Sequence, residues 1–164
     1  MTEYGTVAGF KIYHNVRANE ISGHSDAAID AAKLIASEWI DSRYRLAFPG
    51  TKVGFRNQTR EWPRLGACDI HQYPIAFESV PTEVENATYE AALKHLVEPG
   101  SLSVDFTPSQ YRRAAVDGAI NVEYFGHTNA VEVQTRFQII DETLAPILTG
   151  TGLGAPLSGP SFRA

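Results

Sequence analysis

Apolar residues recur at helical spacing in two long stretches of the chain. Residues 27–40 place their apolar side chains on one face and their polar side chains on the other, which predicts an amphipathic helix with one face on the core. Ser25 is the expected N-cap, and Asp26 lies in the first turn, where a negative charge suits the helix dipole. The expected buried face is Ile29, Ala32, Ile35, Ala36, Trp39 and Ile40, and the expected exposed face is Asp30, Lys33, Ser37 and Asp41.

The second stretch, residues 81–97, has the same spacing. Pro81 is expected at the first helical position, and Pro99 follows the end. Its apolar stripe is centred on Val84, Thr88, Ala91, Ala92 and His95. A short amphipathic helix or a helical turn is predicted over residues 9–18, where Phe10, Tyr13 and Val16 recur. A further helix is predicted over residues 137–148, where Pro146 is expected to disturb the last turn.

Beyond residue 102 the hydrophobic period changes from 3.6 to 2. Residues 111–116 and 119–125 are strand-like and flank Asp117-Gly118, a strong two-residue hairpin signal. The predicted fold is therefore mainly α with a small β-hairpin, an α+β class, in a single domain of residues 1–148. Residues 149–164 form a tail rich in Gly, Pro, Ser and Thr that cannot fold alone and is expected to become ordered on a partner.

The loop of residues 44–64 joins the two long helices and is both basic and aromatic. It is expected to be ordered, with Tyr44, Phe48, Phe55 and Trp62 pinning it to the helices. Basic grooves with stacking aromatics bind single-stranded nucleic acid without sequence preference. Alternatively, the aromatics are buried and the arginines pair with acids of a neighbouring subunit or helix, and this second interpretation is favoured. The candidate interface residues are Arg56, Arg60, Trp62 and Arg64.

Composition narrows the function classes. The 164 residues are 43% apolar and carry a net charge of -5, as in a globular protein and unlike a dedicated nucleic-acid binder. The five histidines are scattered, and Cys68 with His71 supplies only half of a structural zinc site. Residues 150–155 match G-x-G-x-x-A but follow a predicted helix, which excludes the dinucleotide fingerprint. We therefore expect no catalytic site, metal or cofactor, and no signal peptide or membrane span.

Several blocks together resemble a known family. They are Gly9-Phe-x-x-Tyr-His-x-x-Arg17, Trp39-Ile-Asp-Ser-Arg-Tyr44, Gln58-x-x-Glu-Trp-Pro-Arg64, Val80-Pro-x-Glu-Val-x-x-Ala-Thr-Tyr-Glu-Ala-Ala92 and Leu144-Ala-Pro-Ile-Leu148. The chain resembles a family of small proteins encoded among the head–tail genes of tailed bacteriophages and prophages, often labelled DnaT-like single-stranded DNA-binding proteins. Its layout is similar to that of head–tail adaptor, or connector, proteins of phage necks.

The resemblance implies a structural virion protein with no enzymatic activity. Such adaptors form a homo-oligomeric ring, typically of twelve copies, below the portal protein in the neck of the virion. The ring contacts the next neck, head-completion or tail protein, and double-stranded DNA passes through its lumen without sequence-specific binding. By this analogy the chain is made in the host cytoplasm, and its tail docks on the portal through Leu157, Phe162, Arg163 and Ala164. The alternative is a DnaT-like replication protein that binds single-stranded DNA.

Overall fold

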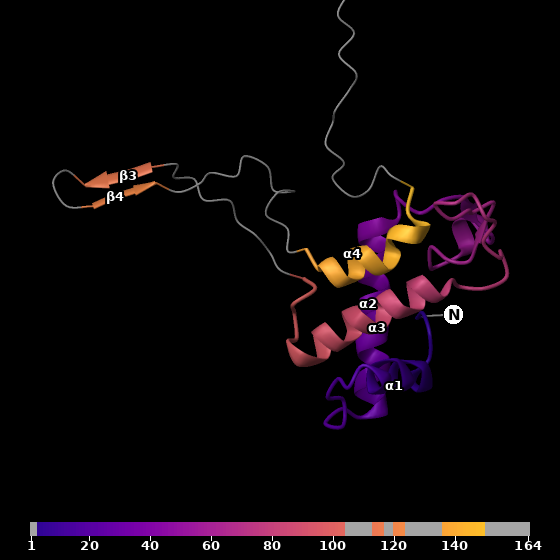
Figure 1. The fold of residues 1–164 in the computed structure, drawn as a ribbon, viewed down its shortest axis with the longest axis horizontal. Helices are drawn as coiled ribbons and strands as arrows, with labels where there is room; N and C mark the ends of the chain where they lie inside the picture. The colour runs from indigo at the N-terminus through magenta and orange to yellow at the C-terminus, as the bar shows by residue number, and fades with distance from the viewer. Residues whose placement is uncertain (1–2, 104–112, 117–119, 124–135, 150–164) are drawn as a thin grey trace, which may run out of the picture. The chain divides into compact units, whose positions relative to one another are not determined.

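The computed structural model describes residues 3–103, 113–116, 120–123 and 136–149. The chain divides into two compact units, one built from residues 1–102 and 137–164 and the other from residues 103–136. The first unit holds α1 (Val7–Val16), α2 (Asp26–Tyr44), α3 (Thr82–Val97) and α4 (Gln138–Leu144), which continues into the 3-10 turn η3 (Ala145–Ile147). It also contains two short strands, β1 (Thr51–Lys52) and β2 (Arg64–Leu65), and the 3-10 turn η1 (Phe55–Asn57) between them (Figure 1).

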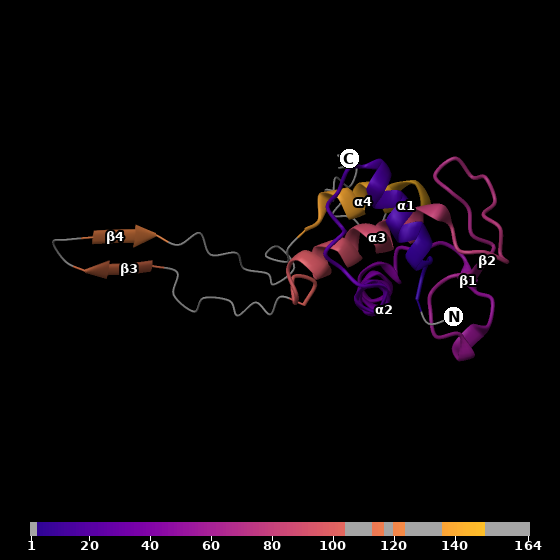
Figure 2. The same cartoon turned by 90° about the horizontal axis from the view of Figure 1, so that it is seen from below.

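The helices of the first unit enclose its hydrophobic core. α3 is the central layer, since it packs against α2, α4 and α1. Figure 2 shows α2 end-on, with α1, α3 and α4 all on one side of it. The core comes mainly from these helices and includes Phe10, Ile29, Ala36, Ile40, Val84, Ala91, Ile140 and Leu144. The predicted mainly α fold with a small hairpin is confirmed.

α2 departs from the predicted division into one buried and one exposed face. The Ser25 cap is confirmed, because its side chain accepts a hydrogen bond from the Ala28 amide at 3.2 Å. The predicted exposed face is wrong, because Lys33, Ser37 and Asp41 are buried. The N-terminal segment lies against this face: the Tyr4 amide donates to Ser37 Oγ at 2.9 Å, and Lys33 Nζ donates to the Gly5 carbonyl at 3.4 Å.

The opposite error concerns the apolar residues of α2. Ile35, predicted to be buried, is 37% exposed, and its neighbour Leu34 is 38% exposed. The buried arc of α2 is therefore rotated toward its polar residues, because α1, α3 and the N-terminal segment all lie on that side. A sequence pattern that counts every apolar residue as buried cannot anticipate this rotation.

The other helices follow the prediction with shifted ends. α1 begins at Val7, where Thr6 Oγ1 accepts from the Gly9 amide at 2.9 Å, and Val16 is 81% exposed instead of buried. α3 begins at Thr82, one residue later than predicted, so Pro81 is its N-cap and not its first helical residue. The helix predicted over residues 137–148 becomes η3 at Ala145, since Pro146 has no amide hydrogen for the α-helical ladder.

The second unit contains the hairpin. β3 (Arg113–Val116) pairs antiparallel with β4 (Ile120–Glu123), and the register places Val116 opposite Ile120 and Arg113 opposite Glu123. The predicted hairpin is therefore present, and residues 111, 112, 119, 124 and 125 of the two predicted strands lie outside the described residues. Asp117 and Gly118 lie outside the described residues, as do the tail residues Leu157, Phe162, Arg163 and Ala164.

Candidate functional site

The loop between α2 and α3 begins as a small, tightly hydrogen-bonded hairpin. β1 and β2 pair antiparallel, with Thr51 opposite Leu65 and Lys52 opposite Arg64. The side chain of Gln58 braces the inside: its Oε1 accepts from the Gly54 amide at 2.9 Å, and its Nε2 donates to the carbonyls of Arg60 and Pro63 at 3.0 and 2.9 Å. The loop is thus ordered, as its aromatic content predicted.

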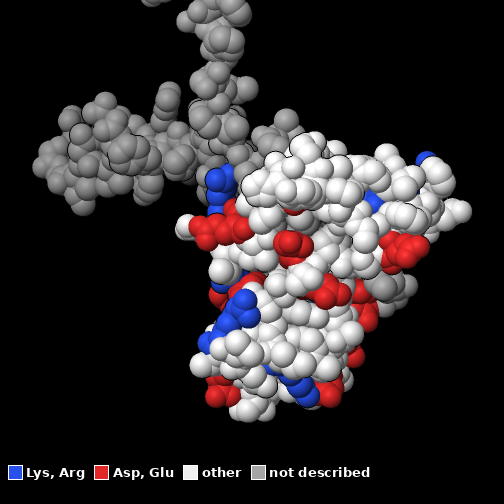
Figure 3. Space-filling view, turned by 45° about the vertical axis from the view of Figure 1, so that its right-hand side comes forward, with Lys and Arg blue, Asp and Glu red and all other residues white. Residues whose placement is uncertain are grey.

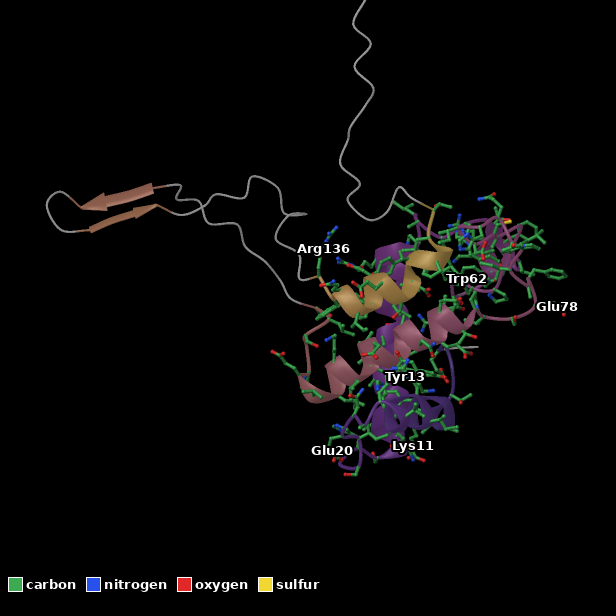
Figure 4. The ribbon with its side chains drawn as sticks, viewed as in Figure 1. Lys11, Tyr13, Glu20, Trp62, Glu78 and Arg136 are labelled. Carbon is green, nitrogen blue, oxygen red and sulfur yellow. The ribbon has the colours of Figure 1, made fainter. Side chains whose placement is uncertain are left out.

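Trp62 anchors the base of this loop in the core. Its side chain is 1% exposed and meets Phe48 edge-on, with ring centroids 5.6 Å apart. The Trp62 amide donates to the hydroxyl of Tyr4 at 3.1 Å, and that hydroxyl donates to Asp41 Oδ1 at 2.5 Å. Figure 4 shows Trp62 on the side of the loop region that faces the helices, whereas Glu78 lies at its outer end. Tyr4, Asp41 and Trp62 therefore join the N-terminal segment, α2 and the loop.

Arg60 is buried beside Asp41, and this contact explains why its guanidinium is not on the surface. The guanidinium of Arg60 lies 3.5 Å from Asp41 Oδ2 and 3.6 Å from Glu38 Oε1, both on α2. Burial raises the pKa of Asp41, although the Tyr4 hydrogen bond and the Arg60 charge favour its ionised form. Burial and the neighbouring Asp41 carboxylate also raise the pKa of Tyr4. Tyr4 therefore remains a neutral donor at physiological pH.

Arg64 is also buried, and it donates hydrogen bonds to backbone carbonyls of the preceding turn. Its Nε donates to the Pro49 carbonyl at 2.6 Å, and its Nη2 donates to the Gly50 carbonyl at 2.7 Å. Its Nη1 lies 2.8 Å from Glu61 Oε2, and Glu61 also pairs with Lys52 at 3.1 Å. The side chain of Arg64 is only 8% exposed, so a guanidinium that the sequence suggested for a partner closes the turn of its own chain.

The tip of the loop, at Phe55 and Arg56, is exposed, whereas Arg60, Trp62 and Arg64 are buried. Phe55, predicted to pin the loop to the helices, is 79% exposed, and that prediction is wrong. Arg56 beside it is exposed, and it is the only one of the four candidate interface residues on the surface of the described structure. Phe55 also has φ of 50°, in the left-handed region that bulky residues rarely adopt. The Gly-Phe-Arg-Asn sequence of a short turn was the signal that could have suggested an exposed tip.

The described residues show no metal-binding constellation. No group of three or more His, Cys, Asp or Glu residues in this part of the chain could hold a metal ion. The backbone amide of His71 donates to Asp69 Oδ1 at 2.8 Å, and its exposed ring faces Tyr73, with ring centroids 6.4 Å apart. None of the helices described could cross a lipid bilayer.

The surface of the described residues is acidic overall. Two of the loop arginines, Arg60 and Arg64, are buried, as is Lys33 of α2, whereas Asp41 and Glu61 are the only buried acids described. The remaining carboxylates outnumber the remaining basic side chains, and Figure 3 shows the acidic residues spread over one face. Phosphate backbones bind through clustered Lys and Arg. The described surface has no such cluster on the face that Figure 3 shows.

Comparison with known proteins identifies the family. Residues 3–160 match the family model described as "Putative DnaT-like ssDNA binding protein", and the chain belongs to this family. No curated protein and no solved structure matches the chain. The description agrees with the family label and with the alternative function expected from the sequence, single-stranded DNA binding. The comparisons do not support the resemblance to head–tail adaptors.

Proposed function

We propose that this member of the DnaT-like family is a structural protein that acts through protein–protein contacts, without catalysis or a cofactor. The observation that carries the proposal is the use of Trp62, Arg60 and Arg64 inside the fold. These side chains formed the strongest nucleic-acid signal in the sequence. The Trp62 ring is buried in the core, and the guanidinium donors of Arg60 and Arg64 are directed at Asp41, Glu61 and backbone carbonyls. Such a loop stiffens a helical building block.

The finer proposal is a head–tail adaptor that forms a dodecameric homo-oligomeric ring below the portal of a tailed-phage virion. An acidic surface supports it, since a conduit for double-stranded DNA works best without rows of phosphate-binding cations. The partners would be the portal protein on one side and the next neck or tail protein on the other. Residues 149–164, with Leu157, Phe162, Arg163 and Ala164, would form the portal-docking segment.

Purified full-length protein mixed with the portal of its phage tests this proposal. We expect co-purification and ring-shaped particles in electron micrographs. Deletion of residues 150–164 should leave the thermal unfolding transition unchanged and weaken co-purification, because those residues lie beyond the last described helical turn. A protein that never binds portal, or one absent from assembled virions, would refute the adaptor function.

Single-stranded DNA binding is the second candidate, and the family description favours it. The described residues that suit it are Phe55 and Arg56, an exposed aromatic ring beside an exposed guanidinium, because bases stack on aromatic rings and phosphates attract cations. Fluorescence anisotropy with a labelled oligo(dT) at physiological salt decides between the two. Micromolar or tighter binding that weakens steeply with salt and is lost in Arg56→Ala would establish this candidate.

A further inference from the structure

The tip of the loop between α2 and α3 presents an apolar anchor on a rigid support. Phe55 is 79% exposed, its backbone has φ of 50°, and the turn beneath it is held by the Gln58 side chain. Lys52 Nζ adds a bond to the Gln58 carbonyl at 3.3 Å. Uncommon backbone conformations persist only where the surrounding structure enforces them, and they cluster at sites of function. A braced, exposed aromatic ring has the character of a binding hot spot.

A receiving surface is present on the outer face of α2. Ala27, Ala31, Leu34 and Ile35 are exposed at spacings of three to four residues, and they form an apolar stripe on the longest helix. Figure 2 shows α1, α3 and α4 on one side of α2, and the stripe residues are not among the buried residues of this helix. The small alanines allow close approach of a partner, and Leu34 and Ile35 provide apolar area. The stripe thus has the features of a docking face that this unit leaves uncovered.

The two surfaces carry opposite charges. Arg56 lies beside the Phe55 anchor, and no ion pair in the described part of the chain involves it. Asp30 and Glu38 flank the α2 stripe, with side chains 57% and 64% exposed. Each also pairs within its own copy, Asp30 with Lys33 at 3.0 Å and Glu38 with Arg60 at 3.6 Å. An apolar anchor with a cation therefore matches an apolar stripe with acids, and complementary charge sets partner choice and orientation.

We propose that the Phe55–Arg56 tip of one copy docks on the outer face of α2 of a second copy. The ring of Phe55 covers Leu34 and Ile35, and Arg56 approaches Glu38. In this proposal the contact is head-to-tail: each copy uses its tip on one neighbour and its α2 face on the other, which produces a closed ring if the rotation closes. This inference rests on the proposed structural function and names the contact through which copies would assemble.

Two variants and their mixture test the contact. Phe55→Ser removes the anchor, and Ile35→Arg blocks the receiver with a charge of the same sign as Arg56, at positions that are 79% and 37% exposed. Each variant alone should lose self-association by at least about tenfold relative to the wild type, measured by sedimentation velocity. Ile12→Ser on α1, at a 65% exposed position, is the matched control and should associate as the wild type does. Circular dichroism verifies that every variant is folded.

A mixture of the two variants tests whether the tip of one copy binds the α2 face of another. The Phe55→Ser chain retains an intact α2 face, and the Ile35→Arg chain retains an intact Phe55 tip. Mixed together, they should form a one-to-one complex that grows no further, since each copy has only one usable surface. A two-fold symmetric pair would hold the wild type at two copies. A wild type that stops at two copies, or two inactive variants that stay inactive when mixed, would overturn the proposal.

The remaining outcomes distinguish this contact from the proposed function. Association unchanged in both variants, or a wild type that remains monomeric up to its solubility limit, overturns this contact, while portal binding continues to test the structural function on its own. Oligo(dT) binding that is lost in Phe55→Ser would assign the tip to nucleic acid. That result overturns this inference and also counts against the structural function.

Discussion

The base and the tip of the loop between α2 and α3 have similar compositions and opposite roles. The base, residues 58–64, buries Arg60, Trp62 and Arg64 against α2 and the preceding turn, whereas the tip exposes Phe55 and Arg56. The difference lies in the available partners. The base meets Tyr4 and Asp41, which supply a hydroxyl and a carboxylate, and the tip lies beyond them. Aromatic and basic residues therefore indicate neither stability nor binding until their partners are known.

The largest expected contrast is between the two aromatic side chains. Trp62→Ala should lower the free energy of unfolding by about 3–5 kcal/mol, because it leaves a cavity beside Phe48 and removes a fully buried ring. Phe55→Ala should change it by no more than about 0.5 kcal/mol, since the ring is 79% exposed. Urea unfolding followed by tryptophan fluorescence and circular dichroism measures both. Equal effects of the two substitutions would contradict the comparison.

The two arginines should differ almost as much. Arg64→Ala removes the donor to the carbonyls of Pro49 and Gly50 and to Glu61 Oε2, and leaves Glu61 paired with Lys52 alone, at a cost of about 2–4 kcal/mol. Arg56→Ala is the matched control and should alter the free energy of unfolding by less than about 0.5 kcal/mol. Denaturant titrations at two salt concentrations provide the check. An Arg64 variant as stable as the Arg56 variant would mean that the buried hydrogen bonds contribute little.

Local sequence patterns were sufficient to predict the helices, but not to predict which side chains of the loop are buried. The spacing of apolar residues, the Ser25 cap and the hairpin signal depend on neighbours in the sequence, and the structure contains α2, α3 and the hairpin close to their predicted positions. The burial of Trp62 and Arg64 depends on contacts between segments far apart in the chain. The Trp62 amide, for example, bonds to a hydroxyl 58 residues away. No spacing rule within residues 44–64 contains that information.

The errors on α2 have the same origin. Lys33, Ser37 and Asp41 have ordinary solvent-facing chemistry, so their burial required knowledge of the N-terminal segment that covers them. Tyr4 was not singled out from the sequence, although its hydroxyl connects Asp41 with the Trp62 amide. A lone tyrosine near a chain end has no local signature of such a role. Among the candidate interface residues, only the exposure of Arg56 could have been inferred from its position in a polar turn.

Tyr4 therefore offers a finer test of what holds the base of the loop. Tyr4→Phe keeps the ring and removes the hydroxyl, which leaves the Trp62 amide and Asp41 each short of a partner. The expected loss in the free energy of unfolding is about 1–3 kcal/mol. Tyr73→Phe, at a 69% exposed position, is the control and should have almost no effect. If both substitutions are neutral in thermal and urea unfolding, the hydroxyl does not stabilise the base.

The smallest expected effect is the pH dependence that His14 of α1 gives to the free energy of unfolding. His14 is fully buried on α1: its Nε2 lies 3.0 Å from the Tyr89 carbonyl, so this nitrogen donates, and its Nδ1 accepts from Asn19 at 2.9 Å. Burial lowers the pKa of His14 from its ordinary value of 6.5, and the nearby Arg17 charge acts in the same direction, while the Tyr89 carbonyl and Glu90 oppose it. The folded state therefore keeps His14 neutral.

The sign of the effect follows from which state binds the proton first. As pH falls below 6.5, His14 in the unfolded chain is protonated before His14 in the folded chain, so the free energy of unfolding decreases until the folded-state pKa is passed. The contribution of His14 is fully present above pH 6.5. Urea unfolding between about pH 7 and pH 5 should show this decline in the wild type and in His71→Gln, whose ring is exposed, and a shallower one in His14→Gln. Identical slopes in all three proteins would mean that the buried ring titrates normally. Stability at neutral pH would then depend on the loop base and on the helical core without a contribution from this histidine.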